Sequence, residues 1–115
     1  MLDIVVKLYC ETGGKIPYLK WIDAIKDKEI RIRIQQRIRR LELGNFGNCK
    51  ALKDGVYELK LDFESGHRIY YGLEGKKIII LLCAGDKSTQ RDDIEKAKKF
   101  WKDYKEMKNV AANKI

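Results

Sequence analysis

Three consecutive segments in the second half of the chain have strand-like hydrophobic patterns, and these segments limit the possible folds more than any other feature. Residues 56–63 and 67–73 place apolar side chains at every second position, as strands with one buried face do. Residues 76–84 are almost continuously Ile and Leu, which is typical of a central strand covered on both faces. Short turns containing Gly66 and Gly75 separate the segments. The sequence therefore predicts an antiparallel β-meander.

Helical patterns lie on both sides of this meander. After an alternating strand at residues 2–9, Pro17 opens a helix at 17–25, and a second helix at 28–43 ends at Gly44. Residues 91–107 form a C-terminal helix, followed by a frayed tail at 108–115. We therefore expect a single α+β domain over residues 1–107, with an N-terminal strand, a two-helix hairpin, the meander and a C-terminal helix. The second helix has a stripe of apolar residues for the core, namely Ile30, Ile34, Ile38 and Leu41.

The apolar face shared by the first two meander strands sets their predicted register. A loop of Glu64, Ser65 and Gly66 pairs Phe63 with His67. Leu61 then faces Ile69, and Leu59 faces Tyr71. On the other, polar face this register places Asp62 opposite Arg68, Lys60 opposite Tyr70, and Glu58 near Gly72.

The third strand returns to the same end of the sheet, so residues 85–90 should bring Lys87 and Gln90 close to Arg68. Lys60, Arg68 and Lys87, with the phenol of Tyr70 and the carboxylate of Glu58, would suit phosphate chemistry. Such cations can hold a phosphodiester and stabilise the charge of its transition state. The alternative is an ordinary cross-strand ion pair between Asp62 and Arg68.

The chain is strongly basic, with 25 Lys and Arg against 17 Asp and Glu in 115 residues and a net charge of +8. Such a charge attracts nucleic acid, an anionic membrane or an acidic protein, although it also fits a merely basic soluble protein. Arg33, Arg37 and Arg40 lie along one flank of the second helix. They form either a phosphate- or partner-binding ridge or a solvated face.

Metal sites, cofactors and membrane spans are not expected. Cys10, Cys49 and Cys83 are widely spaced, and there is a single His, so neither a zinc site nor a disulfide framework is indicated. The apolar run at 78–84 is too short to cross a bilayer, and the N-terminus reads as a strand rather than a signal peptide. We expect a cytoplasmic protein.

The strings GHRIYY, GDKSTQ and DIEKA resemble the C-terminal half of the RelE/ParE toxin superfamily. The chain is most similar to its HigB-like group of phage-derived or addiction-module killer proteins, over roughly residues 4–104. This resemblance implies a RelE-like fold and the toxin role in a type II toxin–antitoxin pair. RelE- and HigB-like toxins cut mRNA on the ribosome by attack of a 2′-hydroxyl without metal, whereas ParE-like toxins inhibit DNA gyrase.

The resemblance also implies roles for individual residues. Arg68 matches the arginine that contacts the scissile phosphate, and Lys87 falls where a basic residue stabilises the transition state. Lys60 matches one of two strand lysines, and Glu58 replaces the other. A tyrosine of the C-terminal helix in RelE is replaced here by acidic residues, Asp92 and Asp93. The general base and acid therefore stay open, with Glu58 as a candidate base and Lys87 or His67 as a candidate acid.

The implied partners are mRNA on the ribosome and a cognate antitoxin that is acidic or has an amphipathic helix. The antitoxin would also connect the complex to operator DNA. Alternatives are a ParE-like gyrase inhibitor and a non-catalytic module that binds antitoxin or nucleic acid. The expected RNA contacts are Arg33, Arg37, Arg40, Tyr70 and Gln90.

Overall fold

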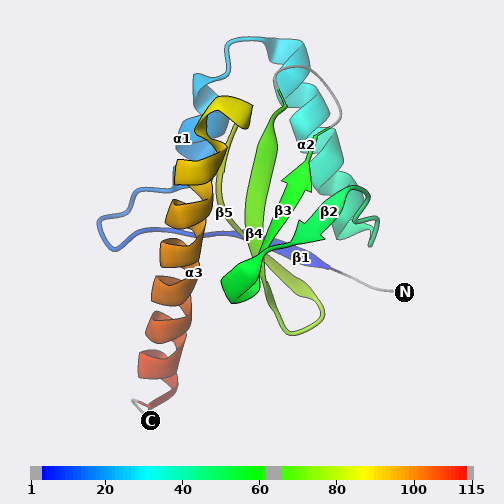
Figure 1. Cartoon of the computed structure of the whole chain (residues 1–115). Coiled ribbons are helices and arrows are strands. Elements are labelled where there is room, and N and C mark those ends of the chain that lie inside the picture. Colours follow the sequence, from blue (N-terminus) through cyan, green and yellow to red (C-terminus); the bar gives the residue numbers. More distant parts are fainter. Residues whose placement is uncertain (1–3, 62–65, 114–115) are drawn as a thin grey trace.

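A five-stranded sheet with the strand order β1-β5-β4-β3-β2 forms the centre of the protein in the computed structural model, which describes residues 4–61 and 66–113 (Figure 1). The predicted antiparallel meander is confirmed as β3-β4-β5, and β1 joins it by pairing parallel to β5. The short edge strand β2 was not predicted, because a strand of this length carries little alternation. The strands are β1 (Val5–Leu8), β2 (Cys49–Ala51), β3 (Val56–Lys60), β4 (Arg68–Glu74) and β5 (Ile78–Gly85).

Three α-helices accompany the sheet, and two begin with recognisable local signals. Pro17 starts α1 (Pro17–Ala24), and the Asp27 side chain caps α2 (Lys28–Glu42) by accepting a bond from the Glu29 N–H at 2.9 Å. Both helices match their predicted positions closely. The C-terminal helix α3 (Gln90–Asn113) continues past Met107, where the pattern predicted its end. Short 3-10 turns η1 (Lys53–Gly55) and η2 (Lys87–Thr89) precede β3 and α3.

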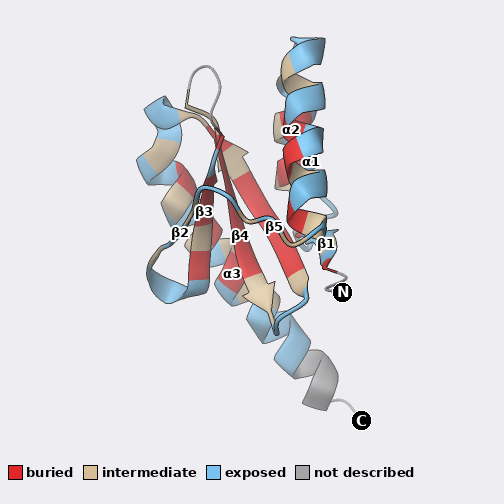
Figure 2. Cartoon of the chain, turned by 90° about the vertical axis from the view of Figure 1, so that its right-hand side faces the viewer, coloured by how far each residue is buried: buried red, intermediate tan, exposed pale blue. Residues whose placement is uncertain are grey.

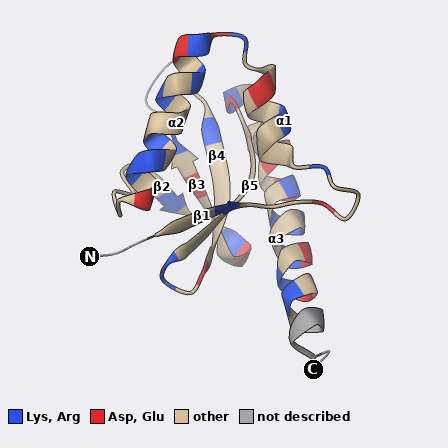
Figure 3. Cartoon of the chain, turned by 180° about the vertical axis from the view of Figure 1, so that it is seen from behind, with Lys and Arg blue, Asp and Glu red and all other residues tan. Residues whose placement is uncertain are grey.

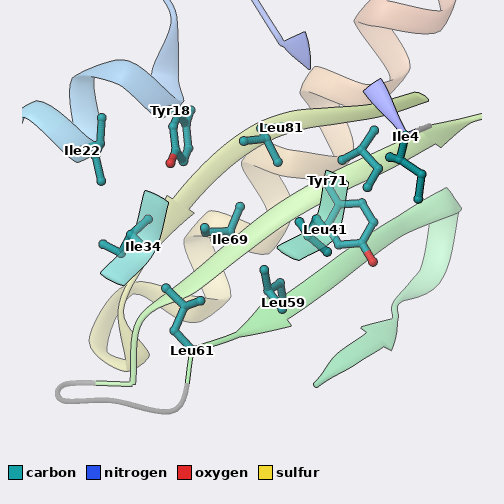
Figure 4. Packing of buried hydrophobic residues seen from close by; sticks show 11 residues of the cluster. Ile4, Tyr18, Ile22, Ile34, Leu41, Leu59, Leu61, Ile69, Tyr71 and Leu81 are labelled. Carbon is teal, nitrogen blue, oxygen red and sulfur yellow. The ribbon is translucent and has the colours of Figure 1, made fainter. Parts of the chain in front are cut away.

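The helices lie on both faces of the sheet, so the protein has three layers (Figure 2). The face predicted to be the core packs against α1 and α2, and Ile22, Ile34 and Leu41 from these helices meet strand residues such as Leu59 and Ile69 (Figure 4). Ile30 and Ile38 pack at the border of this core, which confirms the predicted stripe of α2.

The opposite sheet face was predicted to carry the polar residues of β3 and β4, whose burial beneath a helix was not predicted, whereas the predicted cover on both faces of β5 is confirmed. Part of α3 covers the opposite face, and Ala97 and Trp101 join Val56, Tyr70, Ile80 and Leu82 in a second core. Gly72 makes room for this contact, because a Cβ there would lie 2.5 Å from a Trp101 ring atom. Glu58, Arg68 and Tyr70 on this face are therefore buried, whereas Lys60 at the end of β3 is exposed.

The register of β3 against β4 differs from the prediction by two residues. Lys60 lies opposite Arg68, and Leu59 lies opposite Ile69. Glu58 is opposite Tyr70, and the Leu61 N–H donates to the His67 carbonyl at 2.9 Å. The turn is therefore longer than predicted, although a shift of two preserves the face of every side chain. The predicted partners Asp62 and Phe63 lie outside the described residues, but their predicted places opposite Arg68 and His67 belong to Lys60 and Leu61.

Candidate functional site

Three strands of the meander end side by side at the turn between β3 and β4. Lys60 of β3, Arg68 of β4 and Gly85 of β5 lie in register across the sheet. The η2 turn leaves the sheet directly after Gly85, as expected for residues 85–90. This end of the sheet therefore collects most of the predicted catalytic residues.

Arg68 is buried at this end of the sheet, with 6% of its surface exposed. Its Nη1 donates to the Gly66 carbonyl at 2.5 Å, within its own turn. Its Nε lies 3.8 Å from Glu58 Oε2 and makes no hydrogen bond. Removal of one partner of such a buried ion pair would destabilise the fold, because the other charge would be left uncompensated.

Glu58 connects Arg68 to the start of α3. It is 6% exposed, and its Oε2 accepts a hydrogen bond from Gln90 Nε2 at 2.9 Å. The Tyr70 hydroxyl is buried beside it without a hydrogen bond of suitable geometry. Burial and then the negative charge of Glu58 raise the pKa of Tyr70 well above its usual value. Tyr70 is therefore a neutral phenol that can donate a proton but does not act as a base near neutral pH.

Lys87 is exposed and lies next to the Arg68 turn. A Cβ on Gly66 would be 3.1 Å from Arg68 Nη1 and 3.4 Å from Lys87 Cβ, so the three residues gather closely. The preceding Asp86 holds this turn, because its side chain accepts bonds from the Ser88 N–H at 2.8 Å and the Ser88 hydroxyl at 2.5 Å. The predicted proximity of Lys87 to Arg68 is confirmed.

His67 lies on the other side of the sheet end. Its ring contacts Trp21 of α1 edge to face, with 5.8 Å between the centroids. It therefore points to the α1 side, as expected, and away from the Glu58–Arg68 pair.

A basic groove runs between α2 and the end of β3. Its volume is about 340 Å³, and the lining residues that the structure describes include no acidic side chain. Figure 3 shows Lys and Arg residues along α2 on this part of the molecule. Lys60 lines the groove and lies opposite Arg68 in the register of β3 and β4, so the groove reaches the end of the sheet where the buried cluster lies. We call this groove the α2 groove; it is lined by Arg33, Gln36, Arg37, Arg40, Gly47, Asn48, Lys60 and Leu61.

The arginines of the α2 groove are not equivalent. Arg33 and Arg40 are exposed, whereas Arg37 is 9% exposed. Arg37 donates to the Asn45 carbonyl at 3.0 Å and to the Phe46 carbonyl, and it thereby holds the loop after α2. Gly47 has a φ of +57° and lies against the Arg37 guanidinium, where a Cβ would collide with it. Arg37 is thus a structural residue whose RNA contact stays a prediction.

The candidate residues therefore form two connected groups. Glu58, Arg68 and Tyr70 form a buried cluster, with half-buried Gln90 bonded to Glu58 and exposed Lys87 beside it. Lys60 lies opposite Arg68 and lines the α2 groove together with the exposed arginines of α2. Sequence reasoning missed that the cluster lies beneath the start of α3. It also missed Gly47 and the Gly66 carbonyl, since a glycine in a loop does not reveal which side chain lies against it.

Two further observations concern ligands and membranes. Within residues 4–61 and 66–113, His, Cys, Asp and Glu nowhere gather in groups of three or more that could hold a metal ion. In the same part of the chain, none of the helices is both long and apolar enough to cross a membrane.

Comparisons with known proteins place this site in a family. Residues 20–107 match the family model described as Phage derived protein Gp49-like (DUF891). An uncharacterized protein of Haemophilus influenzae is similar to this chain, with 44% identity over 78 residues, which is 68% of this chain and 79% of the relative. The matched residues include β2–β5, both groups of candidate residues and most of α3. The chain therefore belongs to the Gp49-like family of phage-derived proteins, within the RelE/HigB-type toxins.

Proposed function

We propose that this chain is the toxin of a type II toxin–antitoxin system, and that it cuts mRNA on the ribosome without a metal ion. The observation that carries the proposal is the α2 groove, in which the lining residue Lys60 lies opposite Arg68 in the strand register. A groove with several cations and no acidic residue among its described lining residues suits a phosphodiester backbone. Family membership supports the toxin role, and a RelE-like fold and a HigB-like specificity are part of the same proposal.

The proposed reaction needs only groups of the RNA and of the protein. The 2′-oxygen loses its proton to a base and attacks the adjacent phosphorus. The bond from phosphorus to the 5′-oxygen breaks, the leaving oxygen takes up a proton, and the products are a 2′,3′-cyclic phosphate and a 5′-hydroxyl. Negative charge builds up on the non-bridging oxygens, so positioned cations lower the barrier.

The exposed lysines are the best candidates for direct contact with the reacting groups. Lys60 and Lys87 lie on either side of Arg68 and are both exposed. In this proposal Lys87 stabilises the charged phosphate and protonates the leaving oxygen. Glu58 or Lys60 accepts the 2′-hydroxyl proton, and Arg68 holds the phosphate at the floor of the site. Arg33 and Arg40 guide the RNA strand into place, and Gln90 positions Glu58 through its hydrogen bond.

In vitro translation followed by primer extension on the mRNA tests the proposal. Addition of the protein should produce cuts within codons in the ribosomal A site. Lys60→Ala and Lys87→Ala should each lower the cleavage rate about 100-fold, by analogy with removal of one transition-state donor. Lys76→Ala, an exposed lysine in the turn at the opposite end of the sheet, is the matched control. An uncut mRNA with normal translation would contradict the proposal.

A binding toxin without nuclease activity is the second candidate, and the burial of Arg68 favours it. The Arg68 guanidinium is tied to Glu58 and to the Gly66 carbonyl, which leaves it little surface for a phosphate. Such a protein would act like ParE on DNA gyrase or would bind only antitoxin and nucleic acid. A supercoiling assay separates these possibilities, since only a gyrase inhibitor blocks the enzyme while mRNA stays intact.

The proposal includes a setting in the cell. The protein would act in the cytoplasm, where a cognate antitoxin neutralises it and connects the complex to operator DNA. Copurification with a small protein encoded by the neighbouring reading frame would test this part separately.

A further inference from the structure

A cleft of about 560 Å³ lies between α1 and α3, beyond the edge of the sheet, and it is separate from the α2 groove. Figures 1 and 3 show α1 and the loop before it beside α3 from opposite sides. Trp21 and Pro17 of α1 and Phe100 of α3 line its apolar walls. None of these residues has a role in the proposed cleavage reaction.

The cleft lies where the edge of β5 is open. β1 pairs with β5 only from Ile78 to Leu81, and Tyr9 makes the last backbone bond, donating to Leu81. The following residues of β5 have no neighbouring strand on that side within the described chain. Cys83 and Ala84 from this open part line the cleft. An open strand edge offers backbone hydrogen bonds to an added extended segment.

Four lysines surround the cleft, and all are exposed. No carboxylate of the described residues lies within 4.0 Å of their ammonium groups. Lys15 and Lys20 lie close together. The side-chain contact with Lys15 is the largest cause that lowers the pKa of Lys20, and the positive charge of Lys15 is the second. An anionic ligand would relieve this repulsion. The four residues are Lys15, Lys20, Lys96 and Lys99.

The interior of the cleft differs from its rim. Besides the apolar walls it contains Asp93, a carboxylate that is 7% exposed and accepts a bond from the Thr89 hydroxyl at 2.6 Å. Glu11 adds a second acid at the edge. These acids disfavour phosphates within the cleft, whereas an apolar side chain would fit there. Carboxylates at the rim would meet the lysines.

We propose that the cleft between α1 and α3 binds an extended acidic segment of a partner protein. The segment lies along the open edge of β5, places an apolar side chain between Trp21 and Phe100, and directs carboxylates to the four lysines. The surface is inferred from its own geometry and charge. Only the identification of the partner as an antitoxin rests on the proposed function.

Fluorescence anisotropy with the full chain and a short labelled peptide of alternating Glu and Leu tests this inference. The double variant Lys15→Glu/Lys20→Glu should weaken binding about tenfold, since it removes two surface charge contacts. Lys76→Glu/Lys77→Glu causes the same change in net charge at a distant turn and should have a much smaller effect. Equal losses in both variants would show non-specific attraction and overturn the inference.

Two further measurements test the apolar part of the cleft. Ala24 lines the cleft and is exposed, so Ala24→Tyr should fill it without disturbing the core and should weaken peptide binding several-fold. A peptide of alternating Glu and Ser should bind several-fold more weakly than the Glu–Leu peptide. Unchanged binding in either case would overturn the proposal.

A nucleic-acid ligand is the remaining outcome. Displacement of the peptide by a short single-stranded RNA in a manner abolished by Lys15→Glu/Lys20→Glu would assign the cleft to nucleic acid instead. These assays involve no RNA cleavage. Failure of the proposed nuclease function would therefore leave the peptide result intact, and the reverse also holds.

Discussion

Arg68 and the exposed arginines of α2 carry the same charge within one basic region, but they have different partners. Arg68 is 6% exposed and bound to groups of its own fold, Glu58 and the Gly66 carbonyl. Arg33 and Arg40 are exposed in a groove whose described lining residues include no acid. Charge that is buried with an ion-pair partner is needed for the structure, whereas exposed charge at a concave surface can contact a ligand.

A loss of activity therefore has a different meaning for a buried residue than for an exposed one. A substitution of Arg68 alters both the buried ion pair and any contact with phosphate. A substitution of Lys60, Lys87, Arg33 or Arg40 alters an exposed side chain. Stability and function must therefore be measured together.

Arg68→Ala should lower the free energy of unfolding by about 3 kcal/mol, because Glu58 stays buried without its cation. Urea denaturation measures this loss. The double variant Arg68→Met/Glu58→Met should recover most of it, since apolar replacements remove both buried charges. If Arg68→Ala unfolds at the same urea concentration as the wild type, Arg68 is not a structural residue and does not differ in this way from the exposed arginines of α2.

Gly47→Ala should cost about 2 kcal/mol of stability and should also disturb the α2 groove. The substitution places a Cβ against the Arg37 guanidinium at a residue with a φ of +57°. Gly44→Ala is the control, because Gly44 also has a positive φ of +86° but has open space around it. A loss no greater than that of Gly44→Ala in thermal unfolding would show that Arg37 is not held there.

Arg33→Ala and Arg40→Ala should each change stability by less than about 0.5 kcal/mol but weaken binding of a single-stranded RNA. The dependence of log affinity on log salt concentration should become shallower by about 0.7 for each lost phosphate contact. Arg39→Ala removes the same charge from another side of α2, where Arg39 pairs with Glu42 at 3.8 Å. An equal effect of Arg39→Ala on RNA binding would show that RNA does not bind specifically in the α2 groove.

Asp93→Asn should have the smallest effect and should depend on pH. Burial raises the pKa of Asp93, so the folded protein favours the protonated form of this group. The contribution of Asp93 to the free energy of unfolding is therefore lost as the pH rises through its pKa in the folded protein. Asn imitates the protonated acid. The variant should therefore unfold at a slightly higher urea concentration than the wild type at pH 7, and at the same concentration near pH 3. Asp23→Asn, on the exposed side of α1, should show no such difference.

Much of the fold could be predicted because its signals are local. Pro17 and Asp27 mark the starts of α1 and α2, and alternation marks the meander strands. The proximity of Lys87 to Arg68 also followed, since antiparallel strands must return to the same end of the sheet. The proximity of Gln90 to this cluster followed for the same reason.

The register and the burial of the site could not be predicted in this way. Pairings two residues apart keep the same faces, so the hydrophobic pattern permits both Lys60 and Asp62 opposite Arg68. The alternating patterns of β3 and β4 did not show that α3 would cover Tyr70. Polar residues at alternate positions, such as Glu58 and Arg68, usually indicate an exposed face. Both errors concern the same buried cluster.

The amino-acid sequence determined the order of the three α-helices and of every strand except β2, because alternation, helix starts and chain reversal depend on neighbouring residues. It also determined the basic character and the grouping of Arg68, Lys60 and Lys87. The tertiary structure determined which of these cations are exposed. Packing of α3 against the second sheet face encloses Arg68 with Glu58, whereas Arg33 and Arg40 are exposed. Burial depends on contacts between segments far apart in the sequence, and local patterns do not contain that information.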